Sequence, residues 1–172
     1  MAVERENAVT LKGKPLTLVG PELKVGDKAP DFVAVGKDLK PVTLEATKGK
    51  IRVFSVVPSL DTPVCDAQTR RFNQEALGLP EVAVYTVSMD LPFGQSRWCV
   101  AAGVDKVIML SDHKEGSFGA NYGVLIKELR LNSRAIFVLD KEDTLRHVEY
   151  VREVGVHPNY DAALETVRRL SS

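Results

Sequence analysis

The chain has 172 residues, of which 44% are hydrophobic and 27% are charged, and its formal net charge is zero. This size and balance are typical of one globular domain, so we expect a single domain over residues 1–172 that buries its core without disulfide staples. The lack of net positive charge disfavours a nucleic-acid-binding protein, which needs a basic surface to neutralise phosphates.

The N-terminal segment has no basic stretch followed by an apolar run. We therefore expect neither a secretory signal nor a membrane span, and the cytoplasm is the expected location. Next along the chain, apolar and polar residues alternate on both sides of Gly13, which predicts a β-hairpin over about residues 8–20. Gly26 and Pro30 then mark the segment 25–32 as a loop.

From residue 51 onward, apolar strand-like runs alternate with helix-like segments. The predicted strands cover residues 51–57, 82–89, 107–110, 135–139 and 145–151, and the predicted helices cover 63–77, 92–102, 117–122 and 160–170. This alternation is typical of an α/β fold with a central mixed sheet covered by helices on both faces. The last two strands are expected to form a hairpin at an antiparallel edge, and Asn159 is the expected N-cap of the closing helix.

Cys65 follows the first of these strands, in the segment Pro58-Ser-Leu-Asp-Thr62-Pro-Val-Cys65. Thr62 is a good N-cap and Pro63 a good first helical residue, which places Cys65 at the third position of a helix. Unpaired backbone N–H groups and the positive end of the helix dipole favour a thiolate there. Since the thiolate is the nucleophilic form, Cys65 is a candidate reactive thiol.

Each of these residues also has a plain structural interpretation. A free cysteine is often a small buried hydrophobe, and the threonine could simply cap the helix. An arginine near the thiol would stabilise the thiolate further, and the candidates are Arg70, Arg71 and Arg134. Arg134 could instead form an ordinary salt bridge at the start of a strand.

The second cysteine, Cys99, lies 34 residues after the first, late in the helix predicted over 92–102. A cysteine oxidised to sulfenic acid needs a second thiol to resolve it before irreversible oxidation. A disulfide requires α-carbons within about 7 Å of one another, so we expect the second helix to unwind during turnover. Gly94 destabilises that helix by about 1 kcal/mol relative to Ala. The alternative is that Cys99 is a core residue beside Trp98.

The sequence predicts no metal or cofactor site. Two cysteines cannot complete a four-ligand zinc site alone, and the three histidines show no ligand spacing. In a reducing compartment a disulfide is more often catalytic than structural. The absence of a Cys-x-x-Cys pair disfavours a thioredoxin-type dithiol oxidoreductase.

The pattern Pro58-x-x-x-Thr62-x-x-Cys65 resembles the active-site signature of the peroxiredoxins. The longer stretch over residues 58–73 is similar to that of the bacterial thiol peroxidase subfamily, the atypical two-cysteine type. Further stretches at 88–93, 117–124 and 133–140 share the resemblance, which covers nearly the whole chain. Gly94 and Trp98 depart from it, since close relatives are expected to carry Ala and Phe there.

This resemblance implies a thioredoxin-like fold and a peroxidase that reduces hydrogen peroxide and organic hydroperoxides. It implies that Cys65 is the peroxidatic cysteine and Cys99 the resolving cysteine, joined during turnover by an intrachain disulfide. Thr62 and Arg134 are then expected to hold the peroxide, and Pro58 to shield the thiol from water. Thioredoxin is the expected reductant and a homodimer the expected assembly, with no nucleic acid, membrane, metal or cofactor involved.

Two other functions fit the same pair of thiols. A disulfide oxidoreductase acting on protein thiols would reduce insulin, and an insulin-reduction assay separates it from a peroxidase. A non-enzymatic redox sensor would react once with its oxidant and then wait for a partner, so the turnover number distinguishes it from an enzyme.

Overall fold

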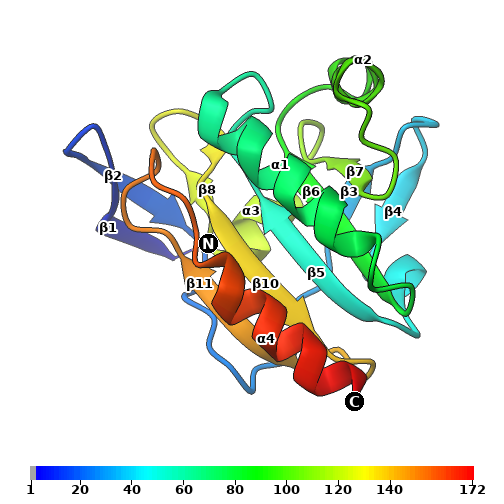
Figure 1. The fold of residues 1–172 in the computed structure, drawn as a ribbon. Coiled ribbons are helices and arrows are strands. Elements are labelled where there is room, and N and C mark those ends of the chain that lie inside the picture. Colours follow the sequence, from blue (N-terminus) through cyan, green and yellow to red (C-terminus); the bar gives the residue numbers. More distant parts are fainter. Residues whose placement is uncertain (1–2) are drawn as a thin grey trace.

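A mixed seven-stranded sheet lies at the centre of the computed structural model, which describes residues 3–172 (Figure 1). Its strand order is β11-β10-β5-β6-β7-β3-β4. The strands cover Val33–Val35 (β3), Pro41–Thr43 (β4), Ile51–Val56 (β5), Val82–Ser88 (β6), Ile108–Ser111 (β7), Ala135–Leu139 (β10) and Leu145–Tyr150 (β11). The central strands β5, β6 and β7 run parallel, and antiparallel pairs extend the sheet on both sides. Every residue of β5 is buried, as expected for a strand covered on both faces.

Helices cover both faces of this sheet. On one face, α1 (Pro63–Ala76), α2 (Pro92–Ala102) and α4 (Tyr160–Ser171) pack around a core that includes Cys65 and Phe72. On the other face, α3 (Ser117–Tyr122) contributes to a second core rich in aromatic rings, among them Phe32 and Phe118. In Figure 1, α1 and α4 cross the front of the sheet and α3 lies behind it. The predicted architecture of a mixed sheet between helices is confirmed. A short 3-10 helix, Glu45–Thr47 (η1), precedes β5.

A second sheet, of four strands, flanks the first. The predicted N-terminal hairpin is present but begins earlier than expected, at Glu4: it consists of β1 (Glu4–Leu11) and β2 (Lys14–Val19). The hairpin is extended by β8 (Leu125–Ile126) and β9 (Leu131–Asn132). The tip of the hairpin binds the segment that follows β11. Glu153 accepts hydrogen bonds from Thr10 Oγ1 at 3.1 Å and from the Gly13 N–H at 3.0 Å. Hydrogen bonds from the N–H groups of Gly155 and Gly13 lower the pKa of Glu153 to about 2, so this clamp carries a full negative charge at neutral pH.

Most predicted elements are confirmed to within one or two residues at each end, and α2, α3 and β10 have the predicted bounds. The predicted antiparallel edge is the β10–β11 pair. Asn159 caps α4 as expected, because its Oδ1 accepts the Ala162 N–H at 3.1 Å. The strands β3, β4, β8 and β9 have two or three residues each, which is too short for alternation to predict them.

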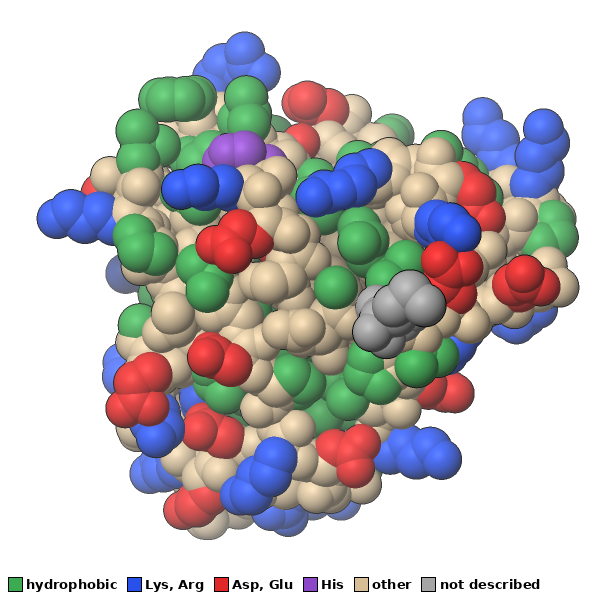
Figure 2. Space-filling model, turned by 180° about the vertical axis from the view of Figure 1, so that it is seen from behind, with side chains coloured by type: hydrophobic (Ala, Val, Ile, Leu, Met, Phe, Trp, Pro, Cys, Tyr) green, Lys and Arg blue, Asp and Glu red, His purple; other side chains and the backbone are tan. Residues whose placement is uncertain are grey.

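Acidic and basic side chains are interspersed over the face shown in Figure 2, with hydrophobic side chains between them. Within residues 3–172, no helix is long and apolar enough to cross a bilayer. In the same part of the chain, no group of three or more His, Cys, Asp or Glu side chains is arranged to hold a metal ion.

Candidate active site

Cys65 lies where β5 has ended and α1 begins, at the predicted third position of the helix. Its side chain is completely buried in the core beneath α1, and its thiol is free. The chain reaches α1 through Pro58, which is also buried, and then through the exposed Thr62 and Pro63. The position combines the positive end of a helix with exclusion of bulk water, and both strengthen electrostatic interactions with the sulfur.

Arg134, the residue before β10, directs its guanidinium group at Cys65. Its Nη2 donates to Cys65 Sγ across 3.3 Å. The arginine is only 2% exposed, and its other donors are used by Val154 O, 2.9 Å from Nε, and by Gln68 Oε1, 2.9 Å from Nη1. Within residues 3–172 no carboxylate pairs with Arg134, which removes the salt-bridge alternative. A fixed positive charge therefore lies beside the sulfur.

Gln68 connects Arg134 to the helix and the sheet. It is buried one turn after Cys65, and its Nε2 donates to Ser55 Oγ on β5 at 2.7 Å while its Oε1 accepts from Arg134. Sequence reasoning missed this residue. Its spacing of three residues from the cysteine, which puts both on one face of α1, is the signal that could have found it.

The segment after β11 fixes the third donor of Arg134. The Val154 carbonyl accepts from Arg134 Nε, and the Val154 N–H donates to the Thr10 carbonyl on β1 at 2.8 Å. Glu153, clamped on the hairpin tip, is the preceding residue. The N-terminal hairpin therefore holds the segment that orients Arg134.

The other two candidate arginines are engaged away from the thiol. Arg70 Nε lies 2.5 Å from Asp66 Oδ1, and Arg71 Nε lies 3.1 Å from Glu75 Oε1, both as pairs one turn apart on α1. Of the three arginines considered from the sequence, Arg134 is the one that contacts the cysteine sulfur.

Thr62 occupies the N-cap position of α1 through its backbone, but its side chain does not cap the helix. The hydroxyl donates instead to the Ser59 carbonyl at 3.0 Å, while the Asp66 N–H donates to the Thr62 carbonyl at 3.0 Å. The predicted side-chain cap is therefore wrong. The physical reason is local competition, since a threonine hydroxyl readily bonds to a backbone carbonyl three residues earlier in a tight turn.

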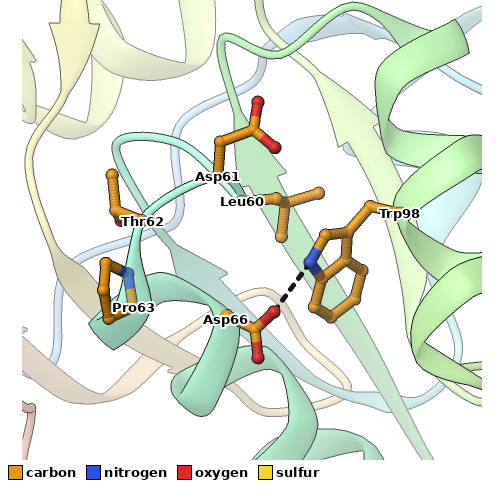
Figure 3. Close-up of a pocket in the computed structure, with 6 residues that line it drawn as sticks. All are labelled: Leu60, Asp61, Thr62, Pro63, Asp66 and Trp98. Carbon is orange, nitrogen blue, oxygen red and sulfur yellow. Dashed lines mark hydrogen bonds between the residues drawn. The ribbon is translucent and has the colours of Figure 1, made fainter.

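An open pocket of about 500 Å³ lies beside this loop, between the start of α1 and helix α2 (Figure 3). It is lined by Leu60, Asp61, Thr62, Pro63, Asp66 and Trp98. Cys65 does not line the pocket, because its side chain is buried in the core. The two aspartates give the opening an acidic character, and the indole of Trp98 faces Asp66 across it.

Asp90 ties the loop before Cys65 to the loop before α2. Its carboxylate accepts hydrogen bonds from Ser59 Oγ, the Leu60 N–H and Ser88 Oγ, each at 2.8 Å. Sequence reasoning also missed this residue. The signal was an acidic residue just past the end of a buried strand, where α/β proteins commonly place functional groups.

Cys99 lies in the second half of α2 and packs against the same core as Cys65. It is half-buried and its thiol is also free. Burial raises the pKa of this thiol, and the positive charge of Lys37 opposes the shift only in part. Cys99 is therefore held as a neutral thiol at neutral pH.

The chain is similar to known proteins over most of its length. Residues 24–164 match the Redoxin family. The chain is 56% identical over 161 residues to the thiol peroxidase of Halalkalibacterium halodurans, covering 94% of this chain and 97% of the relative. It is 55% identical over 162 residues to the thiol peroxidase of Bacillus subtilis, with 94% and 97% covered.

A solved structure, the peroxiredoxin-like protein from Aquifex aeolicus, is 44% identical to the chain. It superposes with a TM-score of 0.89 and covers 95% of this chain and 97% of its own. This likeness confirms the predicted thioredoxin-like fold. The chain therefore belongs to the Redoxin family and, within it, to the bacterial thiol peroxidase subfamily of peroxiredoxins.

Proposed function

We propose that this chain reduces hydrogen peroxide and organic hydroperoxides with Cys65 as the peroxidatic cysteine. The thiolate attacks one peroxide oxygen, so that an S–O bond forms while the O–O bond breaks. The departing oxygen takes up a proton and leaves as water or as an alcohol. The sulfur is oxidised to a sulfenic acid as the peroxide is reduced.

The observation that carries this proposal is the Arg134 donor 3.3 Å from Cys65 Sγ. During attack, negative charge moves from the sulfur to the departing oxygen, and a guanidinium fork beside the sulfur stabilises charge at both atoms. Gln68 and Val154 already hold this fork in place. Little reorganisation is then needed at the moment of reaction.

Thr62 and Pro58 are proposed to shape the space for the peroxide. One hydroxyl both donates and accepts, so Thr62 can bridge the sulfur and the peroxide once it turns from the Ser59 carbonyl. Pro58 is buried and has no N–H, so it excludes water without adding a competing donor. Because Cys65 is completely buried, the loop 58–62 must move for the peroxide to reach it.

We propose that the sulfenic acid on Cys65 then condenses with Cys99. A disulfide bond forms, the S–O bond breaks, and the hydroxyl leaves as water with the proton of the Cys99 thiol. The two thiols lie on different helices and are both free, so this step requires α2 to open. An external dithiol then reduces the disulfide and itself becomes oxidised.

Thioredoxin is the proposed external dithiol, and a homodimer formed by single-domain chains is the proposed assembly, as the family resemblance implies. Consumption of NADPH in the presence of thioredoxin and its reductase measures the first. The mass of the protein in solution, from light scattering, measures the second.

Replacement of each cysteine by serine tests the reaction sequence. Cys65→Ser should abolish peroxide consumption with thioredoxin, because no thiolate remains at the site. Cys99→Ser should still reduce one equivalent of peroxide and then stop, since its sulfenic acid has no resolving thiol. Retained turnover in Cys65→Ser would overturn the proposed function, and retained thioredoxin-coupled cycling in Cys99→Ser would overturn the intrachain disulfide.

A further inference from the structure

The second half of α2 lies between two hydrogen-bonded side chains, Gln95 and Asn73, which we call its anchors. Before it, Gln95 is buried, and its Nε2 donates to Ser88 Oγ at 3.1 Å and to the Leu110 carbonyl at 3.0 Å. After it, Asn73 Oδ1 on α1 accepts the N–H groups of Lys106 at 2.8 Å and Val107 at 3.3 Å. The segment between these anchors carries Cys99 and ends at exposed residues, so it is the part of α2 that can open without disturbing the sheet.

Between the anchors, three side chains join α2 to α1. Trp98 Nε1 donates to Asp66 Oδ2 at 3.0 Å, as the dashed line in Figure 3 marks. Arg70 pairs with the other oxygen of Asp66, its guanidinium carbon lies 5.5 Å from the centre of the Trp98 ring, and its Nη1 donates to the Ala102 carbonyl at 3.3 Å. We call the side chains of Asp66, Arg70 and Trp98 the Trp98 latch.

We propose that the Trp98 latch sets how fast Cys99 reaches the oxidised Cys65. Asp66 follows Cys65 directly in α1, and Trp98 precedes Cys99 directly in α2, so the latch joins the two helices at the two thiols. Unwinding α2 requires Trp98 to leave Asp66 and Arg70. Trp98 and Asp66 are thus positioning residues for the disulfide-forming step, an inference that rests on the function proposed above.

The latch also sets the fate of the sulfenic acid. While α2 stays closed, a second peroxide can oxidise the sulfenic acid to a sulfinic acid, with release of water or an alcohol. Once α2 opens, condensation with Cys99 removes the sulfenic acid and ends that competition. A stronger latch therefore lengthens the lifetime of the sulfenic acid and makes the enzyme easier to inactivate with excess peroxide.

Trp98→Phe tests the latch because it keeps an aromatic ring but removes the five-membered ring of the indole, whose N–H donates to Asp66. Loss of a hydrogen bond to a carboxylate should accelerate disulfide formation roughly tenfold, which corresponds to about 1.4 kcal/mol. The peroxide concentration that inactivates the enzyme should rise in proportion. Rapid mixing with peroxide, quenching with a thiol-alkylating reagent and mass spectrometry measure both quantities without a tryptophan signal.

Arg97→Gln is the matched control, since Arg97 is the exposed neighbour of Trp98 on the same helix. It should form the disulfide at the wild-type rate. The first oxidation of Cys65 should be equally fast in all three proteins, which also shows that they are folded. Adding Trp98→Phe to Asp66→Ala should change the rate little, because Asp66→Ala has already removed the hydrogen bond that Trp98→Phe would remove.

The outcomes separate the two proposals. If wild type reduces peroxide but forms no Cys65–Cys99 disulfide, the proposed disulfide step and the latch both fail, while peroxide reduction at Cys65 stands. If wild type forms the disulfide and Trp98→Phe does so no faster than Arg97→Gln, the latch alone is wrong. Fully additive effects of Trp98→Phe and Asp66→Ala would likewise overturn it.

Discussion

The two thiols of this peroxiredoxin pack against one core but lie in opposite surroundings. Cys65 is completely buried at the start of α1, beside a guanidinium donor that is itself held by a carbonyl and an amide. Cys99 is half-buried late in α2, where burial raises the pKa of its thiol. One sulfur has a positively charged donor beside it, and the other lies in surroundings that favour the neutral thiol.

The two thiols also differ in how many elements hold the helix that carries each of them. Around Cys65 the network joins α1 to β5, β10 and the segment after β11, so the start of α1 is held from several sides. Among residues 3–172, polar side-chain contacts from α2 reach α1 only at the latch, and the residue after Cys99, Val100, is 85% exposed. The start of α1 is therefore held by polar contacts to more elements than the second half of α2.

The largest effect on the reaction rate should come from replacing Arg134, the charged residue beside Cys65. Arg134→Lys keeps a positive charge but loses the fork that reaches the sulfur, Gln68 and Val154 together. The second-order rate constant for Cys65 oxidation should fall about 10²- to 10³-fold, the range for removal of one preorganised donor. Stopped-flow mixing with hydrogen peroxide measures this rate.

The control for this change is Arg152→Lys, an exposed arginine just before the clamp. It should leave the rate within about twofold of wild type, as expected for a surface position. An Arg134→Lys enzyme as fast as this control would show that charge alone, without the fork, activates the thiol.

A smaller effect on the rate of disulfide formation should come from substitutions in α2, which test how much of this helix opens. Ala101→Gly lies in the second half of α2, between the Gln95 and Asn73 anchors. It should destabilise this half by up to about 1 kcal/mol and thereby accelerate disulfide formation up to about fivefold. Gly94→Ala lies before the Gln95 anchor, in a position where a Cβ meets no atom within 4 Å. It should leave the rate unchanged, because this turn stays helical.

Quenched-flow alkylation of both variants measures these rates. A slower disulfide in Gly94→Ala would mean that the whole of α2 unwinds and that the Gln95 anchor is released with it. An unchanged rate in Ala101→Gly would mean that opening of this half does not limit the step.

The smallest effect should be a pH dependence carried by Cys99. Because burial raises the pKa of this thiol in the folded protein, the folded state keeps the proton that the unfolded state loses. Stability is therefore retained below the ordinary cysteine pKa of about 8.5 and lost as pH rises above it. Urea unfolding of reduced protein at about pH 7.5 and pH 9.5 should show a larger loss for wild type than for Cys99→Ser. Equal losses of unfolding free energy in the two proteins would contradict a contribution from the Cys99 thiol.

Local signals were enough to predict the parts of this site that lie next to each other in the chain. Thr62, Pro63 and Cys65 mark the start of α1 through capping preference and fixed φ, and the helix begins there. The donors around the sulfur could not be predicted in this way, because Gln68 and Val154 meet Arg134 only through tertiary packing. The Thr62 side chain was misjudged for a related reason, since a competing carbonyl in the turn captured its hydroxyl.

The clamp between the hairpin and the segment after β11 has a consequence for how activity appears during folding. Thr10 and Glu153, which make that clamp, are 143 residues apart. Contacts between such distant residues form late, because closing so long a loop is entropically unfavourable. A chain emerging from the ribosome presents Cys65 long before it presents the carbonyl of Val154. The hydrogen bonds that orient Arg134 toward Cys65 are therefore complete only when the hairpin and the segment after β11 have met.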